Sequence, residues 1–253
     1  MDEVPKPFDD LAFLSPLSEV RAQELATFLA REGSGDVLDL GCGWAGLLLR
    51  ALAAGTHLTG LGIDIDAEAI ARGRADAERL GLQDRLELRV GDAGDAAPDT
   101  AGAVVCIGAS QIWGPDAAEG APLDYRSALV ALRSRLEFGS PAVYGEVIWT
   151  APPTPAATRP LGGRADEFLA LPALLDVVDE CGFVIVRTHQ ASLDEWDAFE
   201  SGYLAGPARW LAANGDDHPD AATVRRDLAV HRNGYFRGYR GILGMAYLQL
   251  LAV

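Results

Sequence analysis

A glycine-rich turn, Gly41-Cys42-Gly43-Trp44-Ala45-Gly46, follows a short apolar stretch and precedes a second, longer one. Its spacing is G-x-G-x-x-G, the pattern with which a strand–turn–helix unit binds a nucleotide. Glycine lets the chain turn sharply and brings backbone amides against a ligand, and the N-terminus of the following helix favours negative charge. The turn alone predicts a nucleotide-like cofactor, or nothing more than a sharp turn.

Three aspartates stand near this turn, at places where short apolar stretches end. Asp64 ends the stretch after the turn, where a carboxylate accepts both hydroxyl groups of a ribose. Asp92 ends a third stretch, where it either accepts the exocyclic amine of an adenine or forms a turn. Asp39 precedes Gly41 by two residues and disfavours a pyrophosphate there, because two anions would share one helix terminus. The three acids together favour a nucleoside with an ammonium or sulfonium group over NAD.

A second set of residues has the chemistry to contact or activate a reaction partner. The candidates for catalysis are Glu146, Gln111 and His231, and the candidates for substrate binding are Trp113, Trp149 and Tyr235. Glu146 lies in an apolar stretch, where a carboxylate is costly to bury alone, so it is either functional or satisfied at a strand end. His231 and Tyr235 are four residues apart and share a helix face, which suits packing as well as a pocket wall.

Apolar stretches of strand length alternate with amphipathic stretches of helix length through the first part of the chain. Strands are predicted over 37–40, 57–65, 85–90, 101–110 and 141–149, and helices over 15–33, 44–54, 67–80 and 123–138. Nearly continuous apolar strands separated by helices are typical of a parallel sheet that is covered on both faces. Because the crossovers are right-handed, the predicted fold class is α/β with a doubly wound, mostly parallel sheet.

The last third of the chain departs from this alternation. It contains a Pro-rich stretch over 151–163, a helix over 171–182, a strand over 183–191, a helical insertion over 192–240 and a last strand over 241–253. Ser192 and Glu195 form a capping box at the start of the insertion. We predict one domain over 1–253 that includes this cap insertion. The N-terminal helical segment over 1–35 either acts as a lid or packs as an ordinary segment.

The charge of the chain restricts its partners. Of its 253 residues, 37 are acidic and 21 are Lys or Arg, which gives a formal net charge of −16. Polyanions bind through Lys and Arg, so neither nucleic acid nor an anionic membrane is an expected partner. The three cysteines form no metal-binding pattern, so no metal site is predicted. With no apolar run long enough to span a membrane and no signal peptide, a cytoplasmic protein is predicted, and the oligomeric state stays open.

With these features together, the sequence resembles the class I S-adenosylmethionine (SAM)-dependent methyltransferases over nearly its whole length. The stretches "VLDLGCGWAG", "GIDID", "GDA" and "VVCIGAS" resemble the family's cofactor motifs. The resemblance implies a seven-stranded Rossmann-like sheet with an antiparallel last strand. It implies cofactor contacts at Asp39, Gly41, Cys42, Gly43, Asp64, Ile65, Asp92, Ala93, Ile107 and Gly108. The stretch Gly108–Trp113 departs from the Asp/Asn-Pro-Pro-aromatic motif of amine-directed members, so chemistry on DNA or protein amines is not indicated.

The predicted function is therefore SAM-dependent methyl transfer to a small-molecule acceptor by direct in-line displacement. Alignment of the nucleophile, the methyl carbon and the sulfur supplies much of the rate in such a reaction, and some acceptors also need a base. The absence of a basic patch in the sequence disfavours RNA as the acceptor. The alternatives are a SAM-binding enzyme with other chemistry, a non-catalytic SAM-binding subunit and an NAD-dependent oxidoreductase. The sequence leaves oxygen, nitrogen and carbon all open as the methylated atom.

Overall fold

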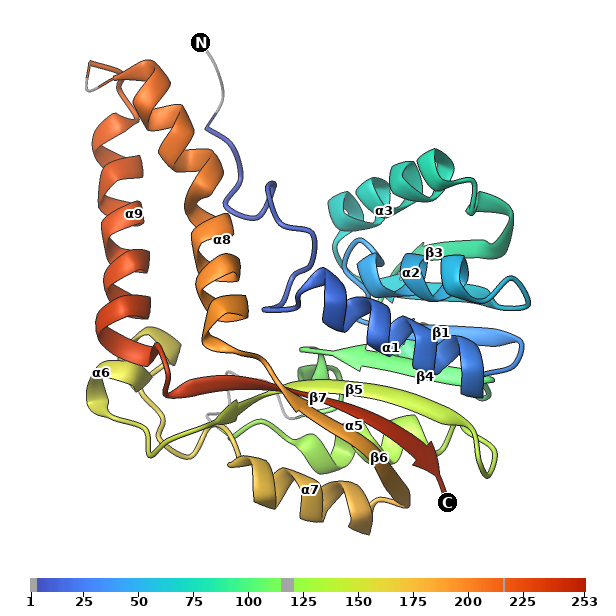
Figure 1. Ribbon diagram of the computed structural model, residues 1–253. Helices are drawn as coiled ribbons and strands as arrows, with labels where there is room; N and C mark the ends of the chain where they lie inside the picture. The colour runs from blue at the N-terminus through green and yellow to red at the C-terminus, as the bar shows by residue number, and fades with distance from the viewer. Residues whose placement is uncertain (1–3, 115–120, 216) are drawn as a thin grey trace. The chain divides into compact units, whose positions relative to one another are not determined.

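The computed structural model describes residues 4–114, 121–215 and 217–253 (Figure 1). The chain divides into two compact units, which are described separately. The sheet unit comprises Ser18–Ile148, Glu167–Gln190 and Met245–Val253, and the helical unit comprises Met1–Leu17, Trp149–Asp166 and Ala191–Gly244.

A seven-stranded sheet with the order β3-β2-β1-β4-β5-β7-β6 forms the centre of the sheet unit. Its strands are β1 (Asp36–Leu40), β2 (Thr59–Asp64), β3 (Leu86–Val90), β4 (Ala103–Ile107), β5 (Pro141–Trp149), β6 (Phe183–Gln190) and β7 (Leu243–Ala252). The pairs β1–β2, β1–β4, β2–β3 and β4–β5 are parallel, whereas β6 and β7 are antiparallel. The predicted doubly wound sheet with an antiparallel last strand is confirmed.

Helices cover both faces of this sheet. They are α1 (Glu19–Glu32), α2 (Gly46–Ala54), α3 (Ala67–Leu80), α4 (Ala93–Ala96), α5 (Tyr125–Arg133) and α7 (Leu171–Glu180), with the short 3₁₀ helices η1 (Gln83–Arg85) and η2 (Ser110–Ile112). Figure 1 shows α1, α2 and α3 over one face, and α5 and α7 over the other. Strands β1, β4 and β5 are almost entirely buried because both of their faces are covered, which explains their unbroken apolar sequences.

Three predicted helix starts are wrong by a few residues, and one of them is α5, which begins at Tyr125 rather than at residue 123. The first helix begins at Glu19 rather than at residue 15, and Ser18 caps it by accepting a hydrogen bond from the N–H of Arg21. The helix after the glycine turn begins at Gly46 rather than at residue 44, because Ala45 has a left-handed φ of 59° and so still belongs to the turn.

Two long helices make up most of the helical unit. They are α8 (Leu193–Asn214) and α9 (Ala221–Gly234), which continues as the π-helix η5 (Tyr235–Tyr239); the short α6 (Pro155–Thr158) and η4 (Arg159–Leu161) also belong to this unit. Figure 1 shows α8 and α9 side by side. The capping box predicted at the start of α8 is present in both directions. Among the described residues, no helix combines the length and apolar character that a membrane span requires.

The N-terminal segment belongs to both units. The part before α1 packs on α8: Leu11 lies against Gly202, Pro5 lies against Gly206, and Arg209 forms an ion pair with Asp10. The helix α1 itself belongs to the sheet unit. The segment before α1 is thus part of the helical unit, and α1 is part of the sheet unit.

Candidate functional site

The glycine turn is held by β2 in the sheet unit. The N–H groups of Gly41 and Cys42 both donate to the carbonyl oxygen of Ile63, at 2.9 and 3.1 Å, and the N–H of Gly43 donates to Oδ2 of Asp64 at 2.7 Å. Gly41 and Gly43 have φ values of +72° and +53°, which favour glycine. The turn after β1 and the acid at the end of β2 thus form one hydrogen-bonded group.

The carboxylate of Asp64, which is predicted to bind a ribose, accepts hydrogen bonds from two backbone N–H groups. Its Oδ1 accepts a hydrogen bond from the N–H of Asp66 at 2.9 Å, while Oδ2 is bonded to Gly43. A carboxylate has about four acceptor positions, so two remain for the hydroxyl groups of a ribose. The next side chain, Ile65, is 77% exposed although it is large and apolar. This arrangement offers a polar edge and an adjacent apolar surface to a nucleoside.

Asp39 is the buried acid of this group. Its side chain is only 4% exposed, and burial, with a smaller contribution from the negative charge of Asp64, raises its pKa to about 8. No donor among the described residues forms a hydrogen bond with this carboxylate. A buried carboxylate without a partner is costly, and a cation placed beside it would remove much of that cost. Asp39 therefore fits an ammonium or sulfonium group and does not fit a phosphate.

The loop after β4 packs directly on the glycine turn. A Cβ atom on Gly41 would lie 2.4 Å from Cβ of Ala109, and a Cβ on Gly94 would lie 3.3 Å from Cγ2 of Ile112. Asp92 caps α4, since its Oδ1 accepts the N–H of Gly94 at 2.7 Å. Gly41 therefore lacks a side chain because the β4 loop occupies that space, in addition to its left-handed φ. The residues at the ends of β1, β3 and β4 converge here.

The remaining residues implied as cofactor contacts lie in the same region. Gly108 has a φ of +64° and donates its N–H to the carbonyl oxygen of Gly145 at 2.8 Å, and Ile107 packs against Gly145. Ala93 is buried at the start of α4. Burial and the negative charges of two nearby aspartates raise the pKa of the Cys42 thiol well above its usual value. The neutral thiol of Cys42 thus fills space beside the turn without adding charge.

Glu146 is enclosed in the sheet unit. It is 3% exposed, and its oxygens accept the backbone N–H groups of Ser110 at 3.1 Å and Val147 at 2.9 Å. Burial raises the pKa of its carboxyl group. Gln111 is exposed on η2, with its amide 3.4 Å from the carbonyl oxygen of Gly108, and Trp113 is partly buried against the core. Glu146 therefore reaches the backbone of the β4 loop and not an open surface.

The other three acceptor-side candidates belong to the helical unit. Trp149 is buried, and its indole N–H donates to the carbonyl oxygen of Ala165 at 3.0 Å. The buried Tyr235 donates its hydroxyl to Asp197 at 2.6 Å. Arg240 also binds Asp197, and this hydrogen-bonded guanidinium lowers the pKa of Asp197 to about 2.

His231 has a partner that the sequence analysis missed. Its Nε2 lies 2.5 Å from Oε2 of Glu200, which is 4% exposed and also accepts the hydroxyl of Tyr239 at 2.8 Å. The imidazole stacks on the ring of Tyr203, with centroids 4.5 Å apart and an interplanar angle of 10°. Glu200 is four residues after the buried Trp196, so its position on the buried face of α8 is the signal that would have indicated it.

A small cavity lies between α8 and α9 beside this pair. Its volume is about 230 Å³, and its lining includes Glu200, Leu204, Ala208, His231, Tyr235 and Phe236. The predicted face of His231 and Tyr235 thus lines a partly open hollow within the helical unit.

The same unit carries a local positive charge. Arg225, Arg226, Arg232 and Arg237 are exposed along α9 and η5. These four arginines lie within 13 positions of the sequence, and Arg226 forms an ion pair with Asp227.

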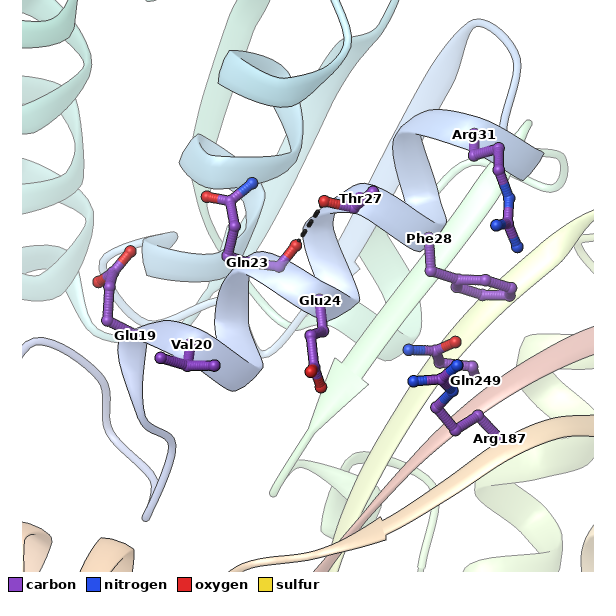
Figure 2. Close-up of a pocket in the computed structure, with 9 residues that line it drawn as sticks. All are labelled: Glu19, Val20, Gln23, Glu24, Thr27, Phe28, Arg31, Arg187 and Gln249. Atoms are coloured by element: carbon purple, nitrogen blue, oxygen red, sulfur yellow. Dashed lines mark hydrogen bonds between the residues drawn. The ribbon is translucent and has the colours of Figure 1, made fainter.

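A larger hollow in the sheet unit contains none of the predicted site residues. It lies between α1 and the strands β6 and β7, with a volume of about 600 Å³ (Figure 2). Figure 2 shows seven lining side chains on α1, together with Arg187 of β6 and Gln249 of β7. It is an open surface groove beside a helix, lined by a mixture of charged, polar and apolar side chains.

The fold and the site define a nucleoside-binding α/β protein of the methyltransferase class. The family model "Methyltransferase domain" matches residues 37–124, which contain the glycine turn and all three aspartates. A SAM-dependent methyltransferase from Geobacter sulfurreducens, solved in complex with S-adenosylhomocysteine (SAH), is 30% identical with a TM-score of 0.81, over 95% of this chain and 94% of that one.

Two further proteins are similar over nearly their whole length. A SAM-dependent methyltransferase from Thiobacillus denitrificans, also in complex with SAH, is 26% identical with a TM-score of 0.81 over 100% of both chains. The uncharacterized protein YjhP of Escherichia coli strain K12 is 30% identical over 241 residues, 94% of this chain and 93% of that protein. The chain belongs to the class I SAM-dependent methyltransferases, and its cofactor is SAM.

Proposed function

We propose that the protein transfers the methyl group of SAM to a small-molecule acceptor. The observation that carries the proposal is the buried, unpartnered carboxylate of Asp39 beside the glycine turn, because it fits the positive charge of SAM. SAM supplies an electrophilic methyl group on a sulfonium. The task of the protein is then to hold donor and acceptor in line and to exclude water.

The proposed cofactor contacts follow from the geometry of the sheet unit. Asp39 and the backbone of Gly41 and Gly43 would hold the methionine part, and Asp64 would hold the ribose hydroxyl groups. Ile65 would pack on the adenine ring, which accounts for its exposure. The remaining contacts would come from Cys42, Asp92, Ala93, Ile107 and Gly108.

The hollow in the helical unit is a better candidate for acceptor binding than the groove beside α1 in the sheet unit. The hollow is lined by His231 and Tyr235, and Glu200 holds the imidazole from one side. A carboxylate bonded to one ring nitrogen of a histidine orients the ring and leaves the other nitrogen available as a base. We therefore propose His231 as the base for acceptors that lose a proton on methylation, with Trp149 and Tyr235 of the same unit as acceptor contacts.

A transfer assay tests the proposal directly. Purified protein would be incubated with SAM labelled in its methyl group and with separate pools of small metabolites, RNA and protein. The proposal expects labelled product and SAH only in small-molecule pools, and loss of turnover in Asp64→Ala. Label in RNA or protein would overturn the small-molecule proposal, and the exposed arginines of α9 make RNA the necessary comparison. SAM consumption without methylated product would favour other SAM chemistry.

We also propose a cytoplasmic location. Cys42, Cys106 and Cys181 are all free thiols. Free thiols persist in reducing compartments, which supports this location.

A further inference from the structure

A buried polar group lies behind the loop that follows β4. Ser110, Tyr144 and Glu146 are 0%, 0% and 3% exposed. The hydroxyl groups of Ser110 and Tyr144 lie 2.6 Å apart, and the N–H of Ser110 donates to Glu146 at 3.1 Å. Ser110 is therefore held twice, through its side chain and through its backbone.

This group is costly to bury. Tyr144 and Glu146 lie on β5, and the neighbouring β4 pairs Cys106 with Tyr144 in the middle of the apolar core. A buried carboxylate and two buried hydroxyl groups stabilise a fold less than apolar side chains of the same shape would. Satisfied polar groups in a core do, however, fix one geometry of the backbone to which they are bonded. The backbone fixed here is the start of η2.

The helix η2 in turn determines the space around the glycine turn. Ala109, directly before Ser110, occupies the position that a side chain on Gly41 would fill, and Ile112 lies against both Gly41 and Gly94. A shift of η2 would therefore change the contacts of the glycine turn and of the Asp92 turn together. The buried group is thus connected by direct contacts to two turns that we assign to the cofactor.

We infer that Glu146 and Tyr144 are positioning residues for SAM binding: they hold Ser110, and through it η2, against the glycine turn. The inference rests on the proposed cofactor site. It gives Glu146 a role through the backbone of Ser110, in place of the catalytic role that its position in the sequence suggested.

A matched pair of tyrosine variants tests the inference. Tyr144→Phe removes the tyrosine partner of the Ser110 hydroxyl and leaves Glu146 as its remaining side-chain partner. Tyr125→Phe is the control, since Tyr125 is 3% exposed and bonds Val147 and Leu169 but no residue of η2. We expect calorimetric titration to show SAH binding weakened about tenfold in Tyr144→Phe, corresponding to about 1.4 kcal/mol, and changed less than twofold in Tyr125→Phe. Both variants should melt at lower temperature than the wild type.

A double variant tests whether Tyr144 acts through Ser110. Adding Ser110→Ala to Tyr144→Phe removes a hydroxyl that has already lost its tyrosine partner, so the two changes act on one contact. The SAH dissociation constant of the double variant should therefore be raised by less than the product of the two single effects. Ser110→Ala alone gives the same binding test if Tyr144→Phe does not fold.

The outcomes are distinct. Equal weakening of SAH binding in the two tyrosine variants, or independent effects of Tyr144→Phe and Ser110→Ala that multiply in the double variant, overturns the positioning role. Absence of SAH binding by the wild type overturns the proposed cofactor site, and this inference with it. Weakening confined to the variants of Tyr144 and Ser110 supports the inference.

Discussion

The ionised form of Asp39 is disfavoured in the free protein. It is buried beside Asp64, and its carboxyl group has a pKa of about 8, so below this pH the free protein keeps it protonated. The ammonium or sulfonium of a bound cofactor favours the ionised form. Binding is therefore linked to the loss of a proton from Asp39 below pH 8.

This linkage predicts the pH dependence of cofactor affinity. SAH affinity should rise from pH 6.5 to pH 8 and level off above the pKa of Asp39, with a slope of at most about tenfold per pH unit. In Asp39→Asn, affinity should be at least about tenfold weaker at pH 8, and the slope should be lost. Calorimetric titration at pH 6.5, 7.5 and 8.5 on both proteins measures this. An equal slope in the two proteins would assign the titration to another group.

The same substitution should stabilise the protein without cofactor. The pKa of Asp39 is raised from 3.8 in the unfolded chain to about 8 in the fold, so the folded state holds an extra proton between these pH values. Stability from this group therefore falls as the pH rises from 4 to 8. Asp39→Asn should melt about 3 °C or more above the wild type at pH 8, with a smaller difference at pH 5. Thermal denaturation without SAM checks this, and a pH-independent difference would contradict it.

Asp64 and Asp66 form a natural pair of test and control. Asp64 binds the glycine turn and is proposed to bind the ribose, whereas Asp66 caps α3 by accepting two backbone N–H groups. Asp64→Ala should abolish measurable SAH binding. Asp66→Ala should cost about 1 kcal/mol of stability, as the loss of an N-cap does, and change SAH affinity less than threefold. Calorimetry with thermal denaturation on both variants decides; comparable affinity losses would mean that disruption of the β2–α3 turn explains the effect.

At the residue scale, the sequence predicts where acidic site residues lie better than it predicts which residues form hydrogen bonds with a given side chain. Asp39 and Asp64 end apolar stretches in a parallel α/β pattern, and the carboxyl ends of such strands meet at one edge of the sheet. Ser110, which bonds Glu146, lies 36 residues from it, and Glu200, which bonds His231, lies 31 residues from it. No local pattern specifies these pairs, because they depend on which strand lies beside β5 and on how α9 packs against α8.

At the element scale, the sequence predicts correctly those strands whose residues are apolar because both faces of the strand are buried. Strands β1, β4 and β5 are buried on both faces, so their apolar runs identify them. The helical insertion predicted over 192–240 does not end in a regular α-helix. It changes to the π-helix η5 over Tyr235–Tyr239, where Gly238 approaches the backbone of Ala156 and Gly234 approaches Pro160. That change of winding depends on packing against α6 and η4, which propensity does not encode.

The pairing of α8 with α9 yields a prediction for the helical unit. Glu200 binds both His231 of α9 and Tyr239 of η5, so Glu200→Ala leaves two polar groups without their partner. Amide exchange over residues 221–240 should become faster by about tenfold or more, while β1, β4 and SAH affinity stay unchanged. Hydrogen exchange with mass spectrometry measures this, with the neighbouring Ser201→Ala as the control. Faster exchange throughout both units would show that the hydrogen bonds of Glu200 do not act on α9 and η5 alone.

The whole molecule combines a strong negative charge with a cofactor of positive charge. SAM carries one more positive charge than SAH, because its sulfur is a sulfonium. The field of a protein with net charge −16 therefore favours SAM over SAH, in addition to any contact in the site. A product that leaves with less attraction than the substrate suits turnover, and this advantage depends on the ionic strength of the solution.

Salt should therefore separate the two ligands. Between about 0.02 and 0.5 M NaCl the screening length shortens from roughly 20 Å to about 4 Å, so long-range attraction is largely lost. We expect the dissociation constant of SAM to rise about threefold to tenfold and that of SAH to change about twofold or less. Asp39→Asn changes the net charge by one, so it should keep most of this difference even though it weakens both ligands. If SAM and SAH respond equally in the wild type, the molecular field does not act on the cofactor; if the difference disappears in Asp39→Asn, it arises locally at Asp39.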